Sequence, residues 1–317
     1  MDPYLISCDW GSTSFRLRVV NAAGRRLAER KSAQGTSAVS EPGLSAEERE
    51  VRFSRVLAGE LAELGDAYAA LPVVVSGMAT SAHGWVELPY AMAPLPLDGS
   101  GLVTAQREVA GHSVTLVSGV RTAHDVMRGE ECELLGLLRS RPELAQENVL
   151  VLLPGTHAKH VCLSEGLLQG FSTAMTGELF ALLKEHSVLR YSFVDSDDDS
   201  APEHDADEVF CMGLRDGLQG SLLAALFQVR AKSLLDGAGA SECTDYLNGA
   251  LLGDELRGED PTEWERILVC APERRARQYR RAVEMIWPET PVLVIGEIEL
   301  DRLVSSGHLA VLAQQDG

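Results

Sequence analysis

Two short turns in the sequence place glycine and hydroxyl side chains directly after apolar segments. A glycine lets the backbone approach a phosphate group without a Cβ clash, and serine and threonine add N–H and hydroxyl donors. An aspartate at the end of a strand can hold Mg²⁺, usually through water, and a lysine adds a positive charge for a phosphate. The residues with these properties are Asp9, Gly11, Ser12 and Thr13 in the first turn and Gly155, Thr156 and Lys159 in the second. Each turn alone is also typical of a plain hairpin, but the pair predicts a triphosphate gripped from both sides of a cleft.

A third segment, His124–Glu131, concentrates carboxylates around one arginine. Adjacent carboxylates can raise each other's pKa, which suits a general base, so Asp125, Glu130 and Glu131 are the candidates. Arg128 is a candidate clamp for a carboxylate, because its planar fork binds two oxygens. The alternative is a charged helix start, in which Glu130 and Glu131 only interact favourably with the helix dipole.

Two further segments are rich in small and polar residues. In Ser76–Trp85, the residues Gly77, Met78 and Trp85 form a plausible substrate wall; the alternative is a surface loop with Trp85 in a core. In Thr173–Leu179, the pattern is typical of a loop that caps a helix, with Thr176 as the N-cap.

Charge and composition exclude several classes of protein. Lys and Arg number 28 against 47 Asp and Glu, a net charge of −19, whereas a nucleic-acid binder needs a basic face. An acidic protein can still bind a nucleotide, because backbone N–H groups, helix N-termini and Mg²⁺ carry the phosphates. No apolar run approaches the roughly 18–20 residues of a membrane span, and the acidic N-terminus argues against a signal peptide. We therefore expect a cytoplasmic protein with no nucleic-acid and no membrane partner.

Metal and nucleotide motifs of other classes are missing from the sequence. The six cysteines are scattered without zinc or disulfide spacing, which indicates free thiols in a reducing compartment. No P-loop or Rossmann glycine pattern and no Gly-x-Ser-x-Gly elbow occurs. The acidic run Asp195–Asp199 lacks the glycine and distal glutamate of a calcium loop, so we expect a solvated loop there.

Alternating and helical patterns predict an α/β fold around these turns. The expected strands are Tyr4–Cys8, Phe15–Val20, Arg25–Lys31, Pro72–Ser76, Val114–Ser118, Val149–Leu153, His160–Leu163, Leu167–Phe171, Arg266–Cys270 and Val292–Ile295. The expected helices are Ser45–Leu64, Glu130–Arg139, Gly177–His186, Asp207–Leu235, Ser241–Leu256, Glu273–Ile286 and Leu300–Ala313. Two α/β halves follow, each opened by a strand hairpin with a small-residue turn. We place the boundary near residue 120, giving domains 1–120 and 121–317.

The ordered set of these motifs resembles the 2-dehydro-3-deoxygalactonokinases, over residues ~4–256. The segments that carry the resemblance are Asp9–Thr13, Gly77-Met78 with Gly84-Trp85, Val126–Glu131, Pro154–Lys159 and Met175–Leu179. A single motif would be weak evidence, but the order of all five is specific. The resemblance implies a two-domain actin-like (ribonuclease H-like) sugar kinase fold, with ATP, Mg²⁺ and a small sugar acid in the interdomain cleft.

The resemblance also implies roles for the candidate residues. Asp9–Thr13 becomes the first phosphate loop, with Asp9 at the metal, and Gly155-Thr156 the second. Related carbohydrate kinases carry a Gly-Asp-Gln segment whose Asp is the base, and Gly129–Glu131 occupies a similar place, which favours Glu130 over Asp125 and Glu131. The expected substrate-binding residues are Gly77, Met78, Trp85, Arg128 and Thr176.

One segment departs from the family pattern. After the strand ending Ile267–Val269, members usually carry a glycine-rich turn on which adenosine lies; here the chain reads Cys270-Ala271-Pro272-Glu273, although Tyr279 follows at the expected helical spacing. Proline removes a donor and Cβ atoms crowd the approach. The alternative to an active kinase is therefore a catalytically weak sugar-acid-binding relative that acts as a sensor or interaction protein. The galactonate or gluconate origin of the substrate and a homodimer both stay open.

Overall fold

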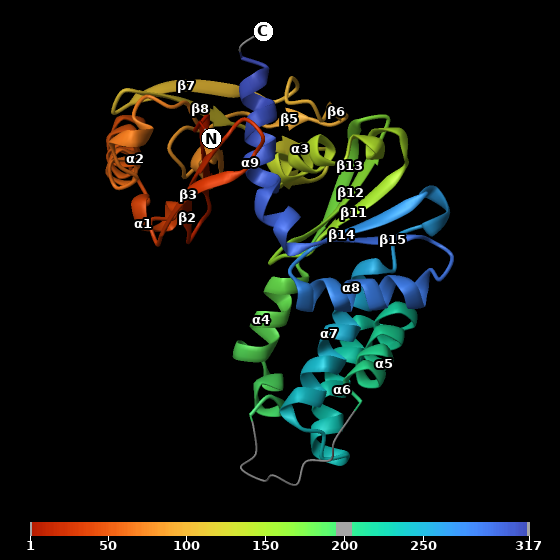
Figure 1. Cartoon of the computed structure of the whole chain (residues 1–317). Coiled ribbons are helices and arrows are strands. Elements are labelled where there is room, and N and C mark those ends of the chain that lie inside the picture. The colour runs from red at the N-terminus through yellow and green to blue at the C-terminus, as the bar shows by residue number, and fades with distance from the viewer. Residues whose placement is uncertain (1, 195–204, 316–317) are drawn as a thin grey trace. The chain divides into compact units, whose positions relative to one another are not determined.

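A computed structural model describes residues 2–194 and 205–315, and the predicted loop Asp195–Asp199 lies outside them. The fold is a mixture of α-helices and β-sheets, which confirms the predicted α/β class (Figure 1). The chain groups into two compact units: residues 1–148, 162–171 and 297–317 form the first, and residues 149–161 and 172–296 form the second. This grouping differs from the expected bounds, because residues 121–148 and the C-terminal helix fall in the first unit. A division into functional domains stays a prediction.

The strands are β1 (Leu5–Trp10), β2 (Phe15–Val20), β3 (Arg26–Ser32), β4 (Val73–Gly77), β5 (Ala91–Met92), β6 (Leu95–Pro96), β7 (Thr104–Val109), β8 (His112–Val117), β9 (Val120–Arg121), β10 (Val126–Met127), β11 (Val149–Leu153), β12 (Ala158–Ser164), β13 (Leu167–Ala174), β14 (Arg266–Cys270) and β15 (Val292–Ile295). The α-helices are α1 (Thr36–Val39), α2 (Ala46–Ala62), α3 (Glu130–Ser140), α4 (Thr176–His186), α5 (Ala206–Gln219), α6 (Leu222–Leu235), α7 (Ala240–Leu256), α8 (Glu273–Ile286) and α9 (Glu297–Ala313). The 3₁₀ helices are η1 (Asp66–Tyr68), η2 (Met78–Thr80), η3 (Pro142–Gln146), η4 (Val188–Ser192) and η5 (Pro261–Glu263). Every predicted strand forms, several with the predicted ends and the others with shifted ends, and each predicted helical segment is helical, one of them as two helices.

The first unit contains a six-stranded sheet in the order β3-β2-β1-β4-β8-β7. The first three strands form the predicted antiparallel meander, whereas β1, β4 and β8 run parallel, so their carboxyl ends meet at one edge. Side chains alternate across a strand, so β1 faces two cores. Ile6, Cys8 and Trp10 pack with Phe53 and Leu57 of α2.

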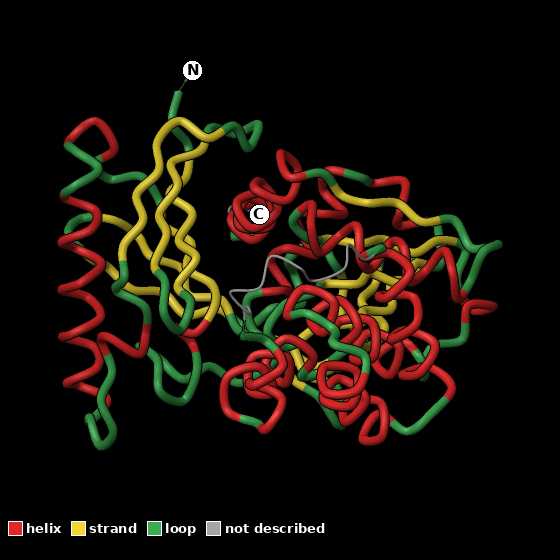
Figure 2. Tube along the Cα trace, turned by 90° about the horizontal axis from the view of Figure 1, so that it is seen from below, coloured by secondary structure: helices red, strands yellow, loops and turns green. Residues whose placement is uncertain are grey.

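The opposite face of this sheet is covered by α9. His308 lies fully buried, with its ring nitrogens 2.8 Å from Ser7 Oγ on β1 and 2.9 Å from Ser76 Oγ on β4. Burial lowers its pKa to about 3, so the imidazole is neutral. Figure 2 shows the sheet with α2 along one side and the C-terminal helix along the other. The C-terminal helix therefore completes the unit that holds the first predicted phosphate loop.

The other six-stranded sheet has the order β15-β14-β11-β12-β13-β6, and β11, β14 and β15 belong to the second unit. The strands β11, β14 and β15 are parallel and apolar. Residues Leu150 and Leu152 of β11 pack with Ile267 and Val269 of β14 against α5, α7 and α8. The core thus fixes the carboxyl ends of β11 and β14, which carry the second turn and the Cys270–Glu273 segment.

Two helices differ from their predicted form. The predicted helix Asp207–Leu235 is two helices. The first, α5, ends at Gln219 with Gly220 as its C-cap, and Ser221 is the N-cap of α6. The predicted cap of α4 is also wrong: Met175 is the N-cap, and Thr176 is the first helical residue. Across residues 2–194 and 205–315, no helix is both long and apolar enough to cross a membrane.

Candidate active site

The first phosphate-loop candidate is the tight turn between β1 and β2. Gly11 N donates to Ser14 O at 2.9 Å, which closes the hairpin. The start of α1 fastens the turn, because Thr36 N donates to Gly11 O and Ser37 N donates to Ser12 O, both at 2.9 Å. The Ser12 and Thr13 side chains are exposed beyond this fastening. Hydrogen bonds from α1 thus fix the backbone of the turn, and its hydroxyl groups are exposed to solvent.

Asp9 stands at the end of β1, with 37% of its side chain exposed. Its carboxylate lies 3.9 Å from Arg16 Nη1 on the neighbouring strand. Burial raises the pKa of Asp9, and the charges of Arg16 and Arg18 oppose that rise. Part of the Asp9 side chain is therefore open to a ligand, and the rest is buried.

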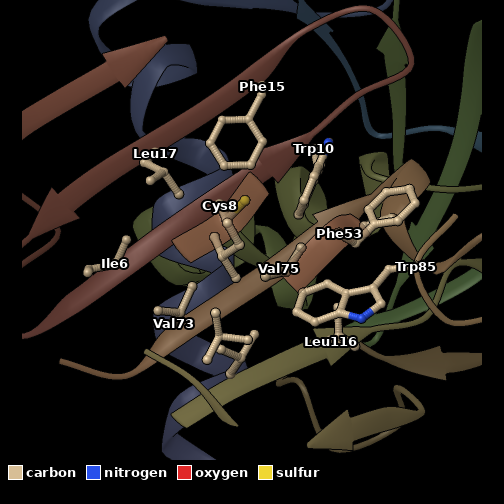
Figure 3. Packing of buried hydrophobic residues seen from close by; sticks show 14 of the residues in the cluster. Ile6, Cys8, Trp10, Phe15, Leu17, Phe53, Val73, Val75, Trp85 and Leu116 are labelled. Carbon is tan, nitrogen blue, oxygen red and sulfur yellow. The ribbon is translucent and has the colours of Figure 1, made fainter. Parts of the chain in front are cut away.

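Trp85, predicted as part of a substrate wall, lies instead in the core beneath the first turn. Its side chain is 2% exposed and stacks on Phe53, with ring centroids 6.5 Å apart and planes 12° apart. Trp10 packs edge-on beside it at 6.2 Å (Figure 3). The core alternative is correct here: a nearly closed indole supports the loop from inside and leaves no open wall.

Gly77 and Gly129 bring the predicted catalytic segment to the end of the sheet. Gly77 ends β4 with φ +90°, and a Cβ there would lie 2.7 Å from Trp10 O, so no other residue fits without a shift. A Cβ on Gly129 would lie 3.7 Å from Gly77 Cα. Gly129 is also the N-cap of α3. The start of α3 therefore lies against the carboxyl end of β4, one strand from Asp9, and Met78 follows there, half-buried.

Glu130 and Glu131, adjacent in sequence, differ in environment. Glu130 is half-buried, and its Oε2 accepts a hydrogen bond from Arg128 N at 3.0 Å. Glu131 is fully buried, and its Oε2 accepts from Gly129 N at 2.7 Å. Burial and the Glu130 charge raise the pKa of Glu131 to about 8. Glu131 therefore lies at the helix start but is shielded from solvent, and its role as a base stays a prediction.

Glu133 is a further candidate residue, which the motifs of the sequence did not indicate. Burial, followed by the charges of Glu130 and Asp9, raises its pKa to about 8, while Arg16 acts in the opposite direction. These interactions place Glu130, Glu133 and Asp9 within electrostatic reach of one another. The spacing in the sequence could have indicated Glu133, because a residue three positions after Glu130 lies on the same face of a helix.

Asp125, the third candidate base, lies in the turn before β10. Its Oδ1 accepts from Val126 N at 2.7 Å, and its own N donates to Thr122 Oγ1 at 2.9 Å. These contacts shape the turn. Asp125 therefore has a local structural role in this turn.

Arg128 is held by Thr80 and Tyr90, two residues whose pairing with it could not be predicted from spacing. Nη1 donates to Thr80 Oγ1 at 2.5 Å, and the guanidinium carbon lies 4.3 Å from the centre of the Tyr90 ring. Its Nε is buried without a hydrogen-bond partner in the described chain. An oriented guanidinium with an unused donor suits an anion such as a carboxylate.

The second phosphate-loop candidate joins β11 to β12. Glu178 N donates to Thr156 O at 2.9 Å, and Arg275 Nη1 donates to Gly155 O at 3.2 Å. A Cβ on Gly177 would lie 2.3 Å from Gly155 O, so the first turn of α4 packs directly on the loop. As in the first turn, hydrogen bonds from neighbouring helices fix the backbone of this loop.

Lys159 is 5% exposed, and its Nζ donates to Thr173 Oγ1 at 2.9 Å on the neighbouring strand β13. The ammonium is thus engaged inside the hairpin. A role of Lys159 at a phosphate stays a prediction.

A pocket of about 450 Å³ opens beside the second loop, within the second unit. It is lined by Pro154, Gly155, Thr176, Gly177, Phe180, Phe210, Asn248, Leu251, Leu252, Pro272, Arg274, Arg275, Gln278 and Tyr279. Apolar walls with a few polar groups are typical of a small-ligand site. In the departing segment, Ala271 is buried in the core and Pro272 lines the pocket. The departure therefore leaves the pocket open.

No group of three or more His, Cys, Asp or Glu side chains suited to hold a metal occurs among residues 2–194 and 205–315. Mg²⁺ does not require one, because it keeps several waters and binds through one or two carboxylates plus substrate phosphates. Asp9 meets that requirement in residue type and exposure.

Comparison with known proteins gives consistent results. The sequence pattern of the 2-keto-3-deoxy-galactonokinase family matches residues 9–298. A Rhizobium meliloti (strain 1021) protein named probable 2-dehydro-3-deoxygalactonokinase DgoK1 is 36% identical over 262 residues, 80% of each chain. The 2-dehydro-3-deoxygalactonokinase of Escherichia coli (strain K12) is 30% identical over 258 residues, 79% of this chain and 78% of its own.

A crystal structure of a Sinorhizobium meliloti protein assigned as a 2-dehydro-3-deoxygalactonokinase has the same fold. It superposes with a TM-score of 0.79 at 29% identity, covering 98% of this chain and 99% of the other. The expected actin-like sugar kinase fold is thereby confirmed.

Proposed function

Because the chain belongs to the 2-keto-3-deoxy-galactonokinase family, we propose that it transfers the γ-phosphoryl group of ATP to a hydroxyl of a 2-keto-3-deoxy sugar acid. The expected reaction converts 2-dehydro-3-deoxy-D-galactonate into its 6-phosphate, a step of galactonate catabolism in the cytoplasm. The named relatives support this substrate, since the chain covers about four fifths of each.

The observation that carries the nucleotide assignment is the pocket beside Gly155. Its apolar residues suit an adenine ring, and its volume of about 450 Å³ is in the range of small-ligand sites. The backbone of the adjoining loop suits the phosphates. Tyr279 and Pro272 line the same pocket, so the segment that departs from the family pattern is part of the proposed adenosine wall.

The first turn would add phosphate and metal contacts of its own. Asp9 would hold Mg²⁺ through water, with Glu133 near it in electrostatic terms. When bound, the ion neutralises charge on the β- and γ-phosphates. The hydroxyl groups of Ser12 and Thr13 are exposed beside Asp9 and can donate to phosphate oxygens.

Arg128 would bind the acid group of the substrate. Thr80 and Tyr90 fix the guanidinium, and its buried Nε has no partner within the described residues. Gly77 and Met78 lie at the adjoining strand end and would border the same ligand. A fixed Arg also positions the rest of the sugar acid, and positioning is the main source of rate in phosphoryl transfer.

Glu130 is the proposed general base. Its carboxylate accepts from Arg128 N, so the residue that would bind the acid also orients the base. Glu130 would take the proton of the attacking hydroxyl as the new P–O bond forms and the bond to ADP breaks. Glu133 is its rival, because a raised pKa also marks a group that exchanges protons.

The alternative, a catalytically weak sugar-acid-binding protein, is not favoured. It rested on Ala271 and Pro272, and the pocket stays open beside them. The family match extends through this segment, to residue 298.

The test is ADP release in a coupled assay with Mg-ATP and a panel of keto-deoxy sugar acids. We expect turnover with 2-dehydro-3-deoxygalactonate, slower turnover with the gluconate-derived epimer, and none without sugar acid. Calorimetry with Mg-ATP alone checks nucleotide binding separately. Absence of both ADP release and nucleotide binding would refute the proposal.

A further inference from the structure

A buried carboxylate lies beneath the nucleotide pocket. Glu255, near the end of α7, has a side chain that is only 1% exposed. Its Oε1 lies 2.9 Å from His160 Nε2 and 2.8 Å from the Tyr279 hydroxyl, and its Oε2 accepts from Thr176 Oγ1. Three elements, β12, α4 and α8, therefore meet at one side chain.

His160 places an imidazole between this carboxylate and a second one. The second ring nitrogen, Nδ1, lies 2.7 Å from Glu259 Oε1. Ionised carboxylates only accept hydrogen bonds, so both ring nitrogens donate and the imidazole carries a positive charge. Burial lowers the pKa of His160, but the hydrogen bonds and charges of Glu255 and Glu259 outweigh it and raise the pKa to about 9.

Glu255 fixes the direction of two hydroxyl groups. Thr176 and Tyr279 each have a single hydroxyl hydrogen, and each donates it to Glu255. Both residues also line the pocket. Each hydroxyl can therefore only accept a hydrogen bond from a ligand. On this side, the pocket is lined by hydrogen-bond acceptors.

We propose that Glu255 is a positioning residue that makes the Thr176 and Tyr279 hydroxyls acceptors for a donor group on the nucleoside part of ATP. The proposal rests on the proposed kinase function. Adenosine has two kinds of donor, the ribose hydroxyls and the exocyclic amine of adenine. Thr176 precedes Gly177, which packs against Gly155 of the phosphate loop, so the acceptors lie close to the phosphates. That position favours a ribose hydroxyl, because the ribose is joined directly to the phosphates.

The main test compares nucleotides in the wild-type protein and the Glu255→Gln variant. Glutamine keeps the shape but carries an NH₂ group, so one hydroxyl must turn its hydrogen away from residue 255. A hydrogen bond is worth about 0.5–1.5 kcal/mol, or about 2- to 10-fold in affinity. We expect the wild type to prefer ATP over 2′- or 3′-deoxy-ATP by roughly 10-fold, and the variant to lose most of that preference. The KM for ATP should rise and the KM for sugar acid should stay within about twofold.

Two milder substitutions test the same proposal even if the Glu255→Gln variant does not fold. Thr176→Val and Tyr279→Phe each remove one hydroxyl and leave Glu255 in place. At least one of them should reduce the same preference. Glu242→Gln, on the same helix α7 but outside the network, is the control and should leave both KM values unchanged.

The outcomes separate the proposal from its premise. A loss of preference for ATP over inosine triphosphate, with the deoxy preference intact, would support the acceptors but assign them to the adenine amine. Equal rises in both KM values, or unchanged nucleotide preferences in all three variants, would overturn the proposal and leave the kinase intact. A wild-type protein that neither binds Mg-ATP nor releases ADP from it with any sugar acid would refute the kinase function itself.

Discussion

The two units treat buried carboxylates in opposite ways. In the first unit, Glu131 is fully buried and Glu133 half-buried close to Glu130, and burial with like charge raises both pKa values to about 8. In the second unit, Glu255 is buried as deeply, but His160, Thr176 and Tyr279 all donate to it.

This difference separates a group that reacts from one that supports. Burying a charge costs several kcal/mol unless donors and an opposite charge compensate it. Around Glu130, burial and like charge outweigh the opposing effect of Arg128 and Arg16, and we propose that this cluster exchanges protons, as catalytic sites do. The Glu255 network is closed and holds its neighbours in one orientation. Chemistry is therefore expected in the first unit and nucleotide shape recognition in the second.

The largest effect that would sharpen this contrast is expected from Glu130→Gln. Glutamine keeps the size and the hydrogen bond from Arg128 N but cannot take a proton, so kcat should fall by about 10²–10⁴. Steady-state kinetics with a folding check by circular dichroism measures it. Glu131→Gln is the matched control, because a neutral amide resembles an acid that is protonated at pH 7, and its kcat should change little. If Glu133→Gln or Asp125→Asn is the inactive variant instead, the base is misassigned.

Trp85→Ala should give the next largest effect, on stability. Removing a fully buried Trp costs about 3–5 kcal/mol of unfolding free energy, because the stacking on Phe53 is lost and a cavity remains. Urea denaturation measures it, with Phe227→Ala as the control: that ring is 61% exposed, and its loss should cost under about 0.5 kcal/mol. A normal unfolding curve with a raised KM for sugar acid would restore Trp85 to the substrate wall.

The closed network of the second unit should show in the pH dependence of stability. His160 has a pKa of about 9 when folded and an ordinary value of 6.5 when unfolded. The folded state therefore binds the proton more tightly, and its contribution is complete below about pH 6.5 and lost as the pH rises through 9. At 1.36 kcal/mol per pKa unit, that contribution is about 3 kcal/mol.

Its measurement is urea denaturation of the wild type and His160→Gln between pH 6 and 10. Glu255 and Glu259 face the ring from α7 and the residues after it, and Tyr279 from α8 bonds to Glu255. The variant should be less stable at pH 7, and the difference should shrink toward pH 10. A constant difference would mean that His160 is neutral and the network carries no cation.

The elements that hold these sites could largely be predicted from the sequence. The strands β1 to β3 and β11 to β13 follow from apolar runs interrupted by small polar turns, and Glu130 follows from its place after Gly129. These features are local, so residue type and spacing are enough to reveal them. The break at Gly220 escaped because apolar residues continue on both sides of it.

What could not be predicted depends on contacts between distant segments. His160 and Glu255 are 95 residues apart, and Thr80 and Arg128 are 48 apart. Periodicity shows that α9 has a buried face but not that His308 lies against Ser7 and Ser76. Trp85 after a polar loop was equally compatible with a core and a wall, and only the packing of Phe53 on it decides.

The smallest effect is expected from Asp9→Asn, which changes a partly solvent-exposed carboxylate of the first unit. Unlike Glu255, Asp9 keeps over a third of its side chain in solvent, and its Arg16 partner is 3.9 Å away. Asn keeps the shape of the side chain but removes the charge that would hold hydrated Mg²⁺. A ligand that acts through water typically contributes about 10- to 100-fold in activity, so kcat should fall by that factor. The KM for sugar acid should stay within about twofold, because Arg128 is untouched.

Raising the Mg²⁺ concentration separates a metal role from a structural one. If Asp9→Asn weakens the metal site, part of the lost turnover should return at high Mg²⁺, and calorimetry should show weaker Mg-dependent binding of ATP. Asp66→Asn, an exposed aspartate of the same unit, is the control and should behave as wild type at every concentration. A deficit that Mg²⁺ does not relieve would mean that Asp9 serves the turn through Arg16. Near wild-type turnover would remove Asp9 from the site and leave Glu133 as the carboxylate to test at the metal.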